Sequence, residues 1–231
     1  ANNTGGNVVS WEIEPALPTG LTMTNGVISG TPTVNMSTTQ YTLHANNSGG
    51  NRNVSFNITV NEPLAILGSV SNQVFTRSVI ISPVTISNTG GAIATWAIHP
   101  ALPNNLQFAN GVLSGRSNSN MTETTYTVYA NNSGGSVNTS FTITVNEIIP
   151  SISTISNQIY TRGVGISTIT VSNSGGPAAS WEINPALPSG LSMVNGVISG
   201  TPTVNQTTAV TYTLYANNTG GSDSETFTIT I

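Results

Sequence analysis

Ten asparagines stand first in Asn-X-Ser or Asn-X-Thr triplets, the local pattern that accepts N-linked glycans. They are Asn2, Asn35, Asn46, Asn53, Asn57, Asn120, Asn131, Asn138, Asn205 and Asn217. Asn46, Asn131 and Asn217 recur in register, each at the start of an Asn-Asn-[Ser/Thr]-Gly-Gly run where a turn would present the amide to solvent. Chance alone also produces such triplets in a chain so rich in asparagine, serine and threonine. The pattern predicts glycans on surface turns, provided that the host has the enzymes.

The two histidines, His44 and His99, are the candidate residues for general acid–base catalysis. The chain contains three copies of an internal repeat, and neither histidine is retained among them. Tyrosine replaces His44 in the other two copies, and glutamate and asparagine replace His99. Nucleophile-elbow, zinc-protease and P-loop motifs are missing from the sequence. We therefore expect no catalytic residue and no cofactor, and the chain is not predicted to be an enzyme.

Calcium could be bound by Glu62 and Glu147, which follow strand-like runs at the two boundaries between repeats. This ion takes about six to eight oxygen ligands, several of them carboxylates. Asp223 is the only aspartate of the chain, so the carboxylates are too few for such a site. We predict no metal site.

Rows of hydroxyl groups are the last candidate for a ligand surface. Alternation predicts outward side chains at Thr125, Thr127, Tyr129, Tyr215, Thr226, Thr228 and Thr230. Aligned hydroxyls and exposed aromatic rings could contact ice or a glycan. Threonine is also the ordinary solvent-facing residue of a strand. Both interpretations remain open at this point.

The composition excludes several classes of function. Only 5% of the residues are charged, against about 25% in typical soluble domains. The four basic residues are scattered arginines, and nucleic-acid binding requires a cluster of them. Cysteine is absent, which excludes disulfides and thiolate metal sites. No apolar stretch approaches the roughly 20 residues that span a bilayer.

Large aromatic residues recur at intervals of 85 or 86 residues and mark the repeat. The three sets are Trp11, Trp96 and Trp181, then Tyr41, Tyr126 and Tyr212, and finally Phe56, Phe141 and Phe227. This period is longer than that of solenoid repeats, so each copy should be a domain with its own core. We expect the nine aromatic residues to anchor these cores.

Short alternating runs predict that each copy is built from β-strands. In residues 141–145, FTITV, apolar and polar side chains alternate as in a half-buried strand. Asn-Gly pairs at 25–26, 110–111 and 195–196 are strong hairpin signals. No segment shows a sustained helical stripe. The predicted fold is all-β, with antiparallel β-sandwiches arranged in tandem, end to end.

The stretch ALPSGLSMVNGVISGTPT at residues 186–203 has close copies at 16–33 and 101–118. We expect Pro188 and Gly190 to end the tryptophan strand and Leu191 to return to the core. Asn195-Gly196 should then turn the chain back into a second strand. The middle copy ends in SGRSN rather than SGTPT, which favours an architectural role over a shared chemical one.

These motifs resemble a known family. The runs LPSGLSMVNGVISGTPT, YTLYANNTGGSDSETFTITI and ISNQIYTRGVGISTITVSNSGG, in their order around the repeat, are similar to the He-PIG immunoglobulin-like, cadherin-related repeats of large microbial surface and fibre proteins. The resemblance covers nearly the whole chain, as two full units and one shorter unit. It implies a structural segment of an extracellular or cell-surface stalk, fibre or surface layer. The alternative is an adhesin module that binds glycan or ice through threonine, tyrosine and asparagine faces.

Three domains are expected, and we refer to them as the first, second and third repeats. They comprise residues 1–62, 63–147 and 148–231, joined by very short linkers. The first repeat lacks counterparts of the leading strands expected within 65–86 and 150–171. It is either truncated, as part of a longer chain, or completed by a segment from elsewhere. The expected partners are neighbouring repeats or identical chains, with head-to-tail assembly by strand addition.

Overall fold

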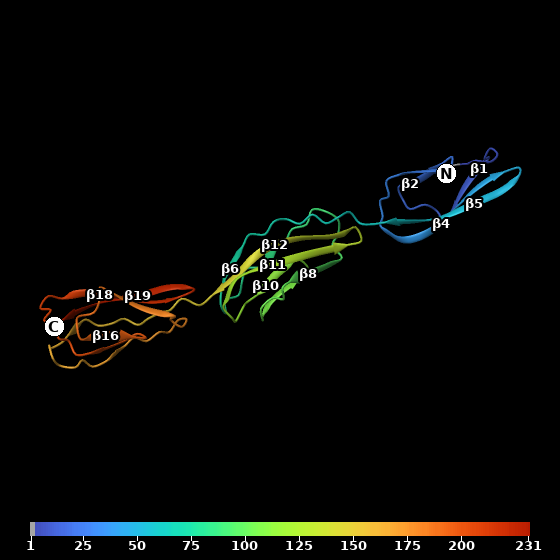
Figure 1. The fold of residues 1–231 in the computed structure, drawn as a ribbon. Coiled ribbons are helices and arrows are strands. Elements are labelled where there is room, and N and C mark those ends of the chain that lie inside the picture. Colours follow the sequence, from blue (N-terminus) through green and yellow to red (C-terminus); the bar gives the residue numbers. More distant parts are fainter. Residues whose placement is uncertain (1–2) are drawn as a thin grey trace. The chain divides into compact units, whose positions relative to one another are not determined.

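The computed structural model describes residues 3–231, and β-strands are the only regular elements over that range (Figure 1). By their contacts, residues up to Gly68 form one compact unit with Ser87–Ala97 and Tyr129–Asn138. Ser69–Ile86, Ile98–Val128 and Thr139–Ile231 form the other compact unit. The all-β fold predicted from alternation is confirmed.

The first repeat contains one sheet and one separate hairpin. The strands are β1 (Ser10–Glu14), β2 (Leu21–Thr24), β3 (Val27–Gly30), β4 (Met36–Asn47) and β5 (Gly50–Val60). The sheet has the order β1-β4-β5, and β2 pairs with β3. All of these pairs are antiparallel. Period-two alternation turns Tyr41 and Leu43 to the inner face of β4, where both are buried.

The second repeat adds two strands before this pattern. Its elements are β6 (Gln73–Thr76), β7 (Val84–Thr85), β8 (Thr95–His99), β9 (Leu106–Ala109), β10 (Val112–Gly115), β11 (Met121–Asn132) and β12 (Gly135–Asn146). They form a sheet of order β6-β12-β11-β8 and a sheet of order β7-β10-β9. The leading segment therefore contributes one edge strand to each sheet of the sandwich.

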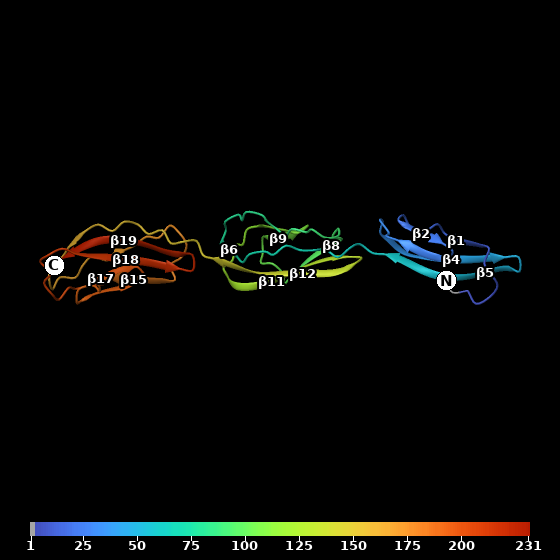
Figure 2. The same ribbon diagram turned by 90° about the horizontal axis from the view of Figure 1, so that it is seen from above.

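The third repeat has the same topology. Its elements are β13 (Gln158–Ile159), β14 (Ile169–Thr170), β15 (Ser180–Asn184), β16 (Leu191–Val194), β17 (Val197–Gly200), β18 (Val210–Asn218) and β19 (Gly221–Thr230). The two sheets have the orders β13-β19-β18-β15 and β14-β17-β16. The long strands β18 and β19 form an antiparallel pair and lie side by side in Figure 2.

One strand pair in each complete sandwich differs from the all-antiparallel expectation. β6 runs parallel to β12, and β13 runs parallel to β19. A tight turn cannot join parallel strands, and here about 70 residues separate the partners along the chain. Hairpin signals in the sequence therefore could not reveal this pairing.

The repeated Pro- and Gly-rich stretch forms the expected hairpin. β16 and β17 pair antiparallel across Asn195 and Gly196, whose φ angles of 49° and 76° suit a two-residue turn. The preceding strand β15 ends earlier than predicted. It stops at Asn184, before Pro185, rather than near Pro188, because a proline has no N–H to continue the ladder.

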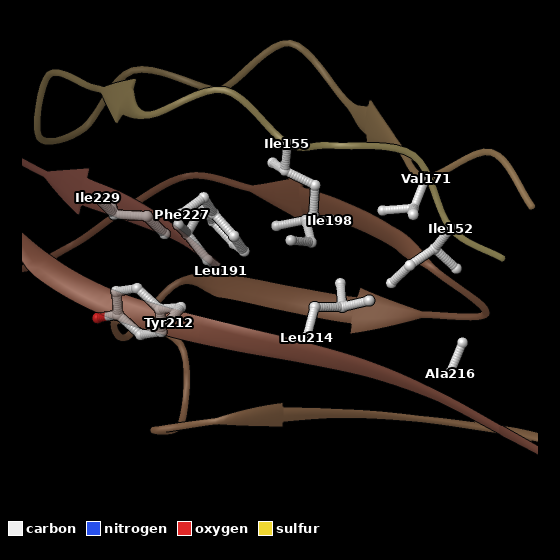
Figure 3. Close-up of a cluster of buried hydrophobic side chains, with 10 residues drawn as sticks. All are labelled: Ile152, Ile155, Val171, Leu191, Ile198, Tyr212, Leu214, Ala216, Phe227 and Ile229. Atoms are coloured by element: carbon white, nitrogen blue, oxygen red, sulfur yellow. The ribbon is translucent and has the colours of Figure 1, made fainter. Parts of the chain in front are cut away.

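The core of the third repeat is formed from both sheets and from the leading segment (Figure 3). Its buried members are Ile152, Ile155, Val171, Leu191, Ile198, Tyr212, Leu214, Ala216, Phe227 and Ile229. Trp181 is half-buried and packs against this cluster. In Figure 3, Ile155 lies over Ile198, so the irregular leading segment closes the core. Full burial of one such aliphatic side chain contributes about 1.5–3 kcal/mol.

Candidate functional site

An apolar groove lies open on the first repeat, on the face shared by the hairpin and the sheet. Its volume is about 390 Å³, and it is lined by Gly26, Val27, Ile28, Leu43, Val54 and Phe56. The inward positions of β4 and β5 supply three of these residues, and the β2–β3 hairpin supplies the others. Alternation thus creates an apolar inner surface that nothing covers within residues 3–61.

The same surface is closed in the other two repeats. Ile28 is half-buried, whereas its counterparts Leu113 and Ile198 are 1% and 0% exposed. Val54 is 53% exposed and belongs to the same open surface. The difference arises because the leading segments add buried side chains over the second and third cores. Those side chains are Ala65, Ile81, Ile86, Ile152, Ile155 and Val171.

A buried carboxylate stands at the end of the second repeat. Glu147 is only 5% exposed. Arg77 Nε lies 2.7 Å from Glu147 Oε1 as an ion pair, although its N–H does not point along the line to the oxygen. Asn120 Nδ2 donates to Oε2 at 3.0 Å, and the N–H of Ile148 donates to Oε1 at 3.1 Å. The Glu147 N–H itself donates to Thr219 Oγ1.

These neighbours set the pKa of Glu147. Burial by itself raises the pKa of the carboxyl, because it disfavours the charged form. Hydrogen bonds from Asn120 and Ile148, together with the charge of Arg77, more than offset this effect. The pKa therefore lies below the ordinary value, and the carboxylate is charged at neutral pH.

The first repeat carries the same carboxylate without the arginine. Glu62 occupies the position of Glu147 and is half-buried. Its backbone N–H donates to Ser133 Oγ at 2.8 Å, just as that of Glu147 donates to Thr219. No arginine pairs with the Glu62 carboxylate in the described part of the chain. Within residues 3–231, the Glu62 carboxylate therefore has no arginine partner, and the groove has no leading segment over it. The second repeat has both.

The predicted glycan acceptors are distributed over all three repeats and are not brought together. Asn35, Asn53, Asn57, Asn120, Asn138 and Asn205 are exposed, and Asn46, Asn131 and Asn217 are half-buried. Asn2 lies outside the described residues. The side-chain amides of the turn asparagines donate hydrogen bonds to the neighbouring strand. For example, Asn131 Nδ2 donates to Thr95 Oγ1 at 3.3 Å. Asn120 is engaged by Glu147, so it is the least available of the exposed acceptors.

Some of the outward hydroxyl groups pair with one another across neighbouring strands. Thr127 Oγ1 lies 2.9 Å from Ser140 Oγ, and Thr42 Oγ1 lies 3.1 Å from Ser55 Oγ. Such cross-strand pairs stabilise a sheet. Tyr129 is 37% exposed and Tyr215 is half-buried. Sheet stabilisation therefore accounts for the hydroxyl pairs without a ligand.

The histidines and acids form no cluster. His44 is half-buried on β4, and His99 is exposed at the end of β8. Within residues 3–231, no three His, Cys, Asp or Glu side chains gather in a group that could hold a metal ion. That part of the chain also has no helix that could span a membrane.

Two functional features escaped the sequence analysis. One is the Arg77–Glu147–Asn120 cluster, whose members lie up to 70 residues apart. The other is the parallel pairing of the leading segments. The sequence predicts strands within 65–86 and 150–171, and Ser-Asn-Gln-[Val/Ile]-[Phe/Tyr]-Thr-Arg recurs there at 71–77 and 156–162, but it does not predict their partners. This recurrence was a visible signal, but only the pairing of β6 and β13 shows what it does.

In the comparison with known proteins, one family model matches nearly the whole chain. The He_PIG family model, described as "Putative Ig domain", matches residues 1–61, 63–146 and 149–231. The matched ranges leave only Glu62 and residues 147–148 between them. A search of curated proteins gave no sequence match.

Several solved structures that resemble this chain contain tandem immunoglobulin domains. The titin I-band fragment I67–I69 has a TM-score of 0.45 at 17% identity, covering 96% of this chain and 88% of that one. Drosophila OTK extracellular domains 3–5 give 0.43 at 16% identity, with 92% and 77% covered. Sidekick-1 immunoglobulin domains 1–5 give 0.37 at 19%, with 95% and 51% covered.

Proposed function

Because this chain belongs to the He_PIG family of immunoglobulin-like domains, we propose that it is a structural repeat segment of an extracellular stalk, fibre or surface-layer protein. The observation that carries the proposal is the close succession of the three matched ranges, with one or two residues between them. Linkers this short leave little free chain between domains. Such an array suits a spacer whose work is mechanical rather than chemical.

The finer form of the proposal is head-to-tail assembly by strand addition. The first repeat supports it, because the outer edge of β5 and the outer edge of β3 carry no strand within residues 3–231. Exposed edges accept strands from other chains. A heterologous contact of this kind builds an open filament when it does not close into a ring.

The binding-module alternative is less well supported. It would use the threonine and tyrosine faces for glycan or ice. Cross-strand pairs such as Thr38 Oγ1 to Thr59 Oγ1, at 2.8 Å, already occupy part of those hydroxyls. We therefore keep the structural role as the proposed function.

Electron microscopy of native material containing this chain tests the proposal. We expect filaments or stalks whose axial period matches one or several repeats. Intact-mass measurement on the same material reports whether the predicted acceptor asparagines carry glycans. Dispersed particles of a single chain, with saturable glycan binding by the isolated protein, would contradict the structural role.

A further inference from the structure

Each linker between repeats contacts two turns of the repeat that follows it. We use linker for residues 62–66 and 147–151. Both turns have the pattern Asn-[Ser/Thr]-Gly-Gly, and we call each pair of turns a linker seat. The turns are residues 88–91 and 132–135 in the second repeat, and 173–176 and 218–221 in the third. At each joint the linker and its seat lie within one compact unit.

The later turn of each seat holds the first two residues of the linker. In the third repeat, Thr219 Oγ1 accepts the N–H of Glu147 at 2.9 Å. Asn218 Nδ2 donates to the next carbonyl, Ile148 O, at 2.7 Å. The counterparts in the second repeat are Glu62 N–H to Ser133 Oγ at 2.8 Å and Asn132 Nδ2 to Pro63 O at 2.7 Å.

The earlier turn of each seat holds the rest of the linker. Gly176 N–H donates to Ile149 O at 3.1 Å, and Asn173 Oδ1 accepts the N–H of Ser151 at 2.9 Å. Four backbone groups of a five-residue linker are therefore bonded to the seat. The counterparts in the second repeat are Gly91 N–H to Leu64 O at 3.0 Å and Ile66 N–H to Asn88 Oδ1 at 2.9 Å.

The seat recognises the backbone of the linker rather than its side chains. Pro63 and Ile148 occupy the same position, as do Ile66 and Ser151, yet the bonds are the same at both joints. Backbone recognition of an extended segment does not depend on its sequence. The seat also accounts for the recurring hydroxyl of the Asn-Asn-[Ser/Thr]-Gly-Gly runs in the second and third repeats without a glycan.

The third residue of the later turn is a glycine because the linker passes so close to it. A Cβ on Gly220 would collide with Glu147 O, and one on Gly134 would collide with Glu62 O. Neither glycine has a positive φ, so close approach and not backbone conformation requires it. The equivalent glycine of the first repeat, Gly49, would place a Cβ only near Asn47 Oδ1, at 3.2 Å.

We propose that the linker seat fixes the linker of the preceding repeat and makes the joint stiff. Glu147 is bonded to both sides of its joint, because Thr219 of the third repeat accepts its N–H while Arg77 and Asn120 of the second repeat bind its carboxylate. β12 ends at Asn146, so no unbonded residue separates the last strand from the seat. The inference deepens the proposed function and rests on it for its use, since a stalk keeps its reach only when its joints resist bending.

Hydrogen exchange of single amides in the full chain measures the seat directly. Thr219→Val keeps the shape of the side chain but removes the acceptor, so the Glu147 N–H should exchange about fivefold faster. The Ser151 N–H is bound by the other turn and should keep its rate. Thr203→Val is the matched control, because this exposed threonine of the same repeat donates to Ser189 O, outside the linker. The control should leave both amides unchanged.

The distance between spin labels on the second and third repeats measures the stiffness of their joint. The chain has no cysteine, so Thr125→Cys and Thr211→Cys supply the only two attachment sites. These threonines are exposed and occupy equivalent positions on β11 and β18. We expect one narrow distance distribution in the otherwise unaltered chain.

Gly220→Ala in the labelled chain should widen this distribution to about twice its original width, because the added methyl group displaces the linker and frees it to move. Gly49→Ala is the matched control, because its Cβ meets the same kind of asparagine oxygen at the same distance but no linker carbonyl. It should leave the distribution unchanged. Should Gly220→Ala also lower protection throughout β18 and β19, the exchange result with Thr219→Val decides.

The outcomes separate this inference from the function on which it rests. A broad distribution in the unaltered labelled chain, or a Glu147 amide whose exchange ignores Thr219→Val, would overturn the seat. Filaments in native material together with a broad distribution would leave the structural function standing. A narrow distribution that widens with Gly220→Ala, in a chain whose native material shows no filaments or stalks, would support the seat and contradict the stalk role.

Discussion

At the scale of single residues, Glu147 is the most constrained charged group of the chain. It is buried, yet the composition offers few charges with which to compensate it. The arginine, an asparagine amide and a backbone N–H supply that compensation together. A buried charge that loses its partner is strongly destabilising, so these contacts act as one unit.

Glu147→Gln should lower the stability of the second repeat by about 1–2 kcal/mol, because the charged contacts become neutral ones. Urea unfolding followed by hydrogen exchange on β11 and β12 measures the loss. Glu62→Gln is the matched control, because Glu62 occupies the same position and has no ion pair within residues 3–231. Equal losses in the two variants would contradict the role given to Arg77.

The lowered pKa of Glu147 also predicts an acid dependence. The unfolded chain holds a proton on this carboxyl at a higher pH than the folded chain does. The stability it contributes is therefore fully present above the ordinary glutamate pKa and is lost as pH falls through the lower folded value. Unfolding midpoints at about pH 7 and about pH 3 should differ more in the unaltered chain than in Glu147→Gln. A variant that loses as much stability in acid as the parent would contradict this assignment.

At the scale of elements, the hairpin turn and the tryptophan strand constrain each other. A Cβ on Gly196 would lie 2.9 Å from the Trp181 ring, and Gly26 meets Trp11 at the same distance. The turn glycine is thus required twice, once by its positive φ and once by the ring that packs on it. This explains why the Asn-Gly pair and the tryptophan recur together in all three copies.

Gly196→Ala compared with Gly163→Ala separates those two requirements. Both glycines have a φ of 76°, but a Cβ on Gly163 would have no atom within 4 Å. We expect Gly163→Ala to cost about 1 kcal/mol from the backbone alone. Gly196→Ala should cost about 2–4 kcal/mol, because the ring must also move. Hydrogen exchange on β18 and β19 measures the loss of stability in both variants. Similar losses would show that the Trp181 ring moves aside without a measurable energetic cost.

At the scale of the whole molecule, stability rests on apolar packing and on hydrogen bonds rather than on charge. Only one ion pair joins Arg to Asp or Glu within residues 3–231. Hydroxyl and amide side chains satisfy one another along the sheets, as in the Thr127–Ser140 pair. The low charge also weakens repulsion between copies, which suits association.

The melting temperature should therefore change by less than about 3 °C between about 0.05 M and 1 M sodium chloride, because there is little charge to screen. Differential scanning calorimetry measures this directly. A steep dependence on ionic strength would point to electrostatic interactions between distant parts of the surface. Sodium sulfate is a useful comparison, because it strengthens apolar burial without acting through ion pairs.

The sequence by itself determined what is encoded locally. Alternation placed a strand at residues 141–145, within β12, and Asn-Gly pairs placed the hairpins, because both signals depend on residues close together in the chain. The family followed from the order of the same motifs. The predicted end of the tryptophan strand near Pro188 was wrong, because Pro185 has no N–H to continue the ladder and β15 ends at Asn184.

The tertiary structure alone decided which distant residues meet. The parallel pairing of β6 with β12 and the contact of Arg77 with Glu147 join positions about 70 residues apart. No periodicity encodes such partners, because they are selected when two sheets close over one core. The same physics defines the open groove of the first repeat. Its lining looks like any other inner face in the sequence, and it is open because no strand among residues 3–231 covers it.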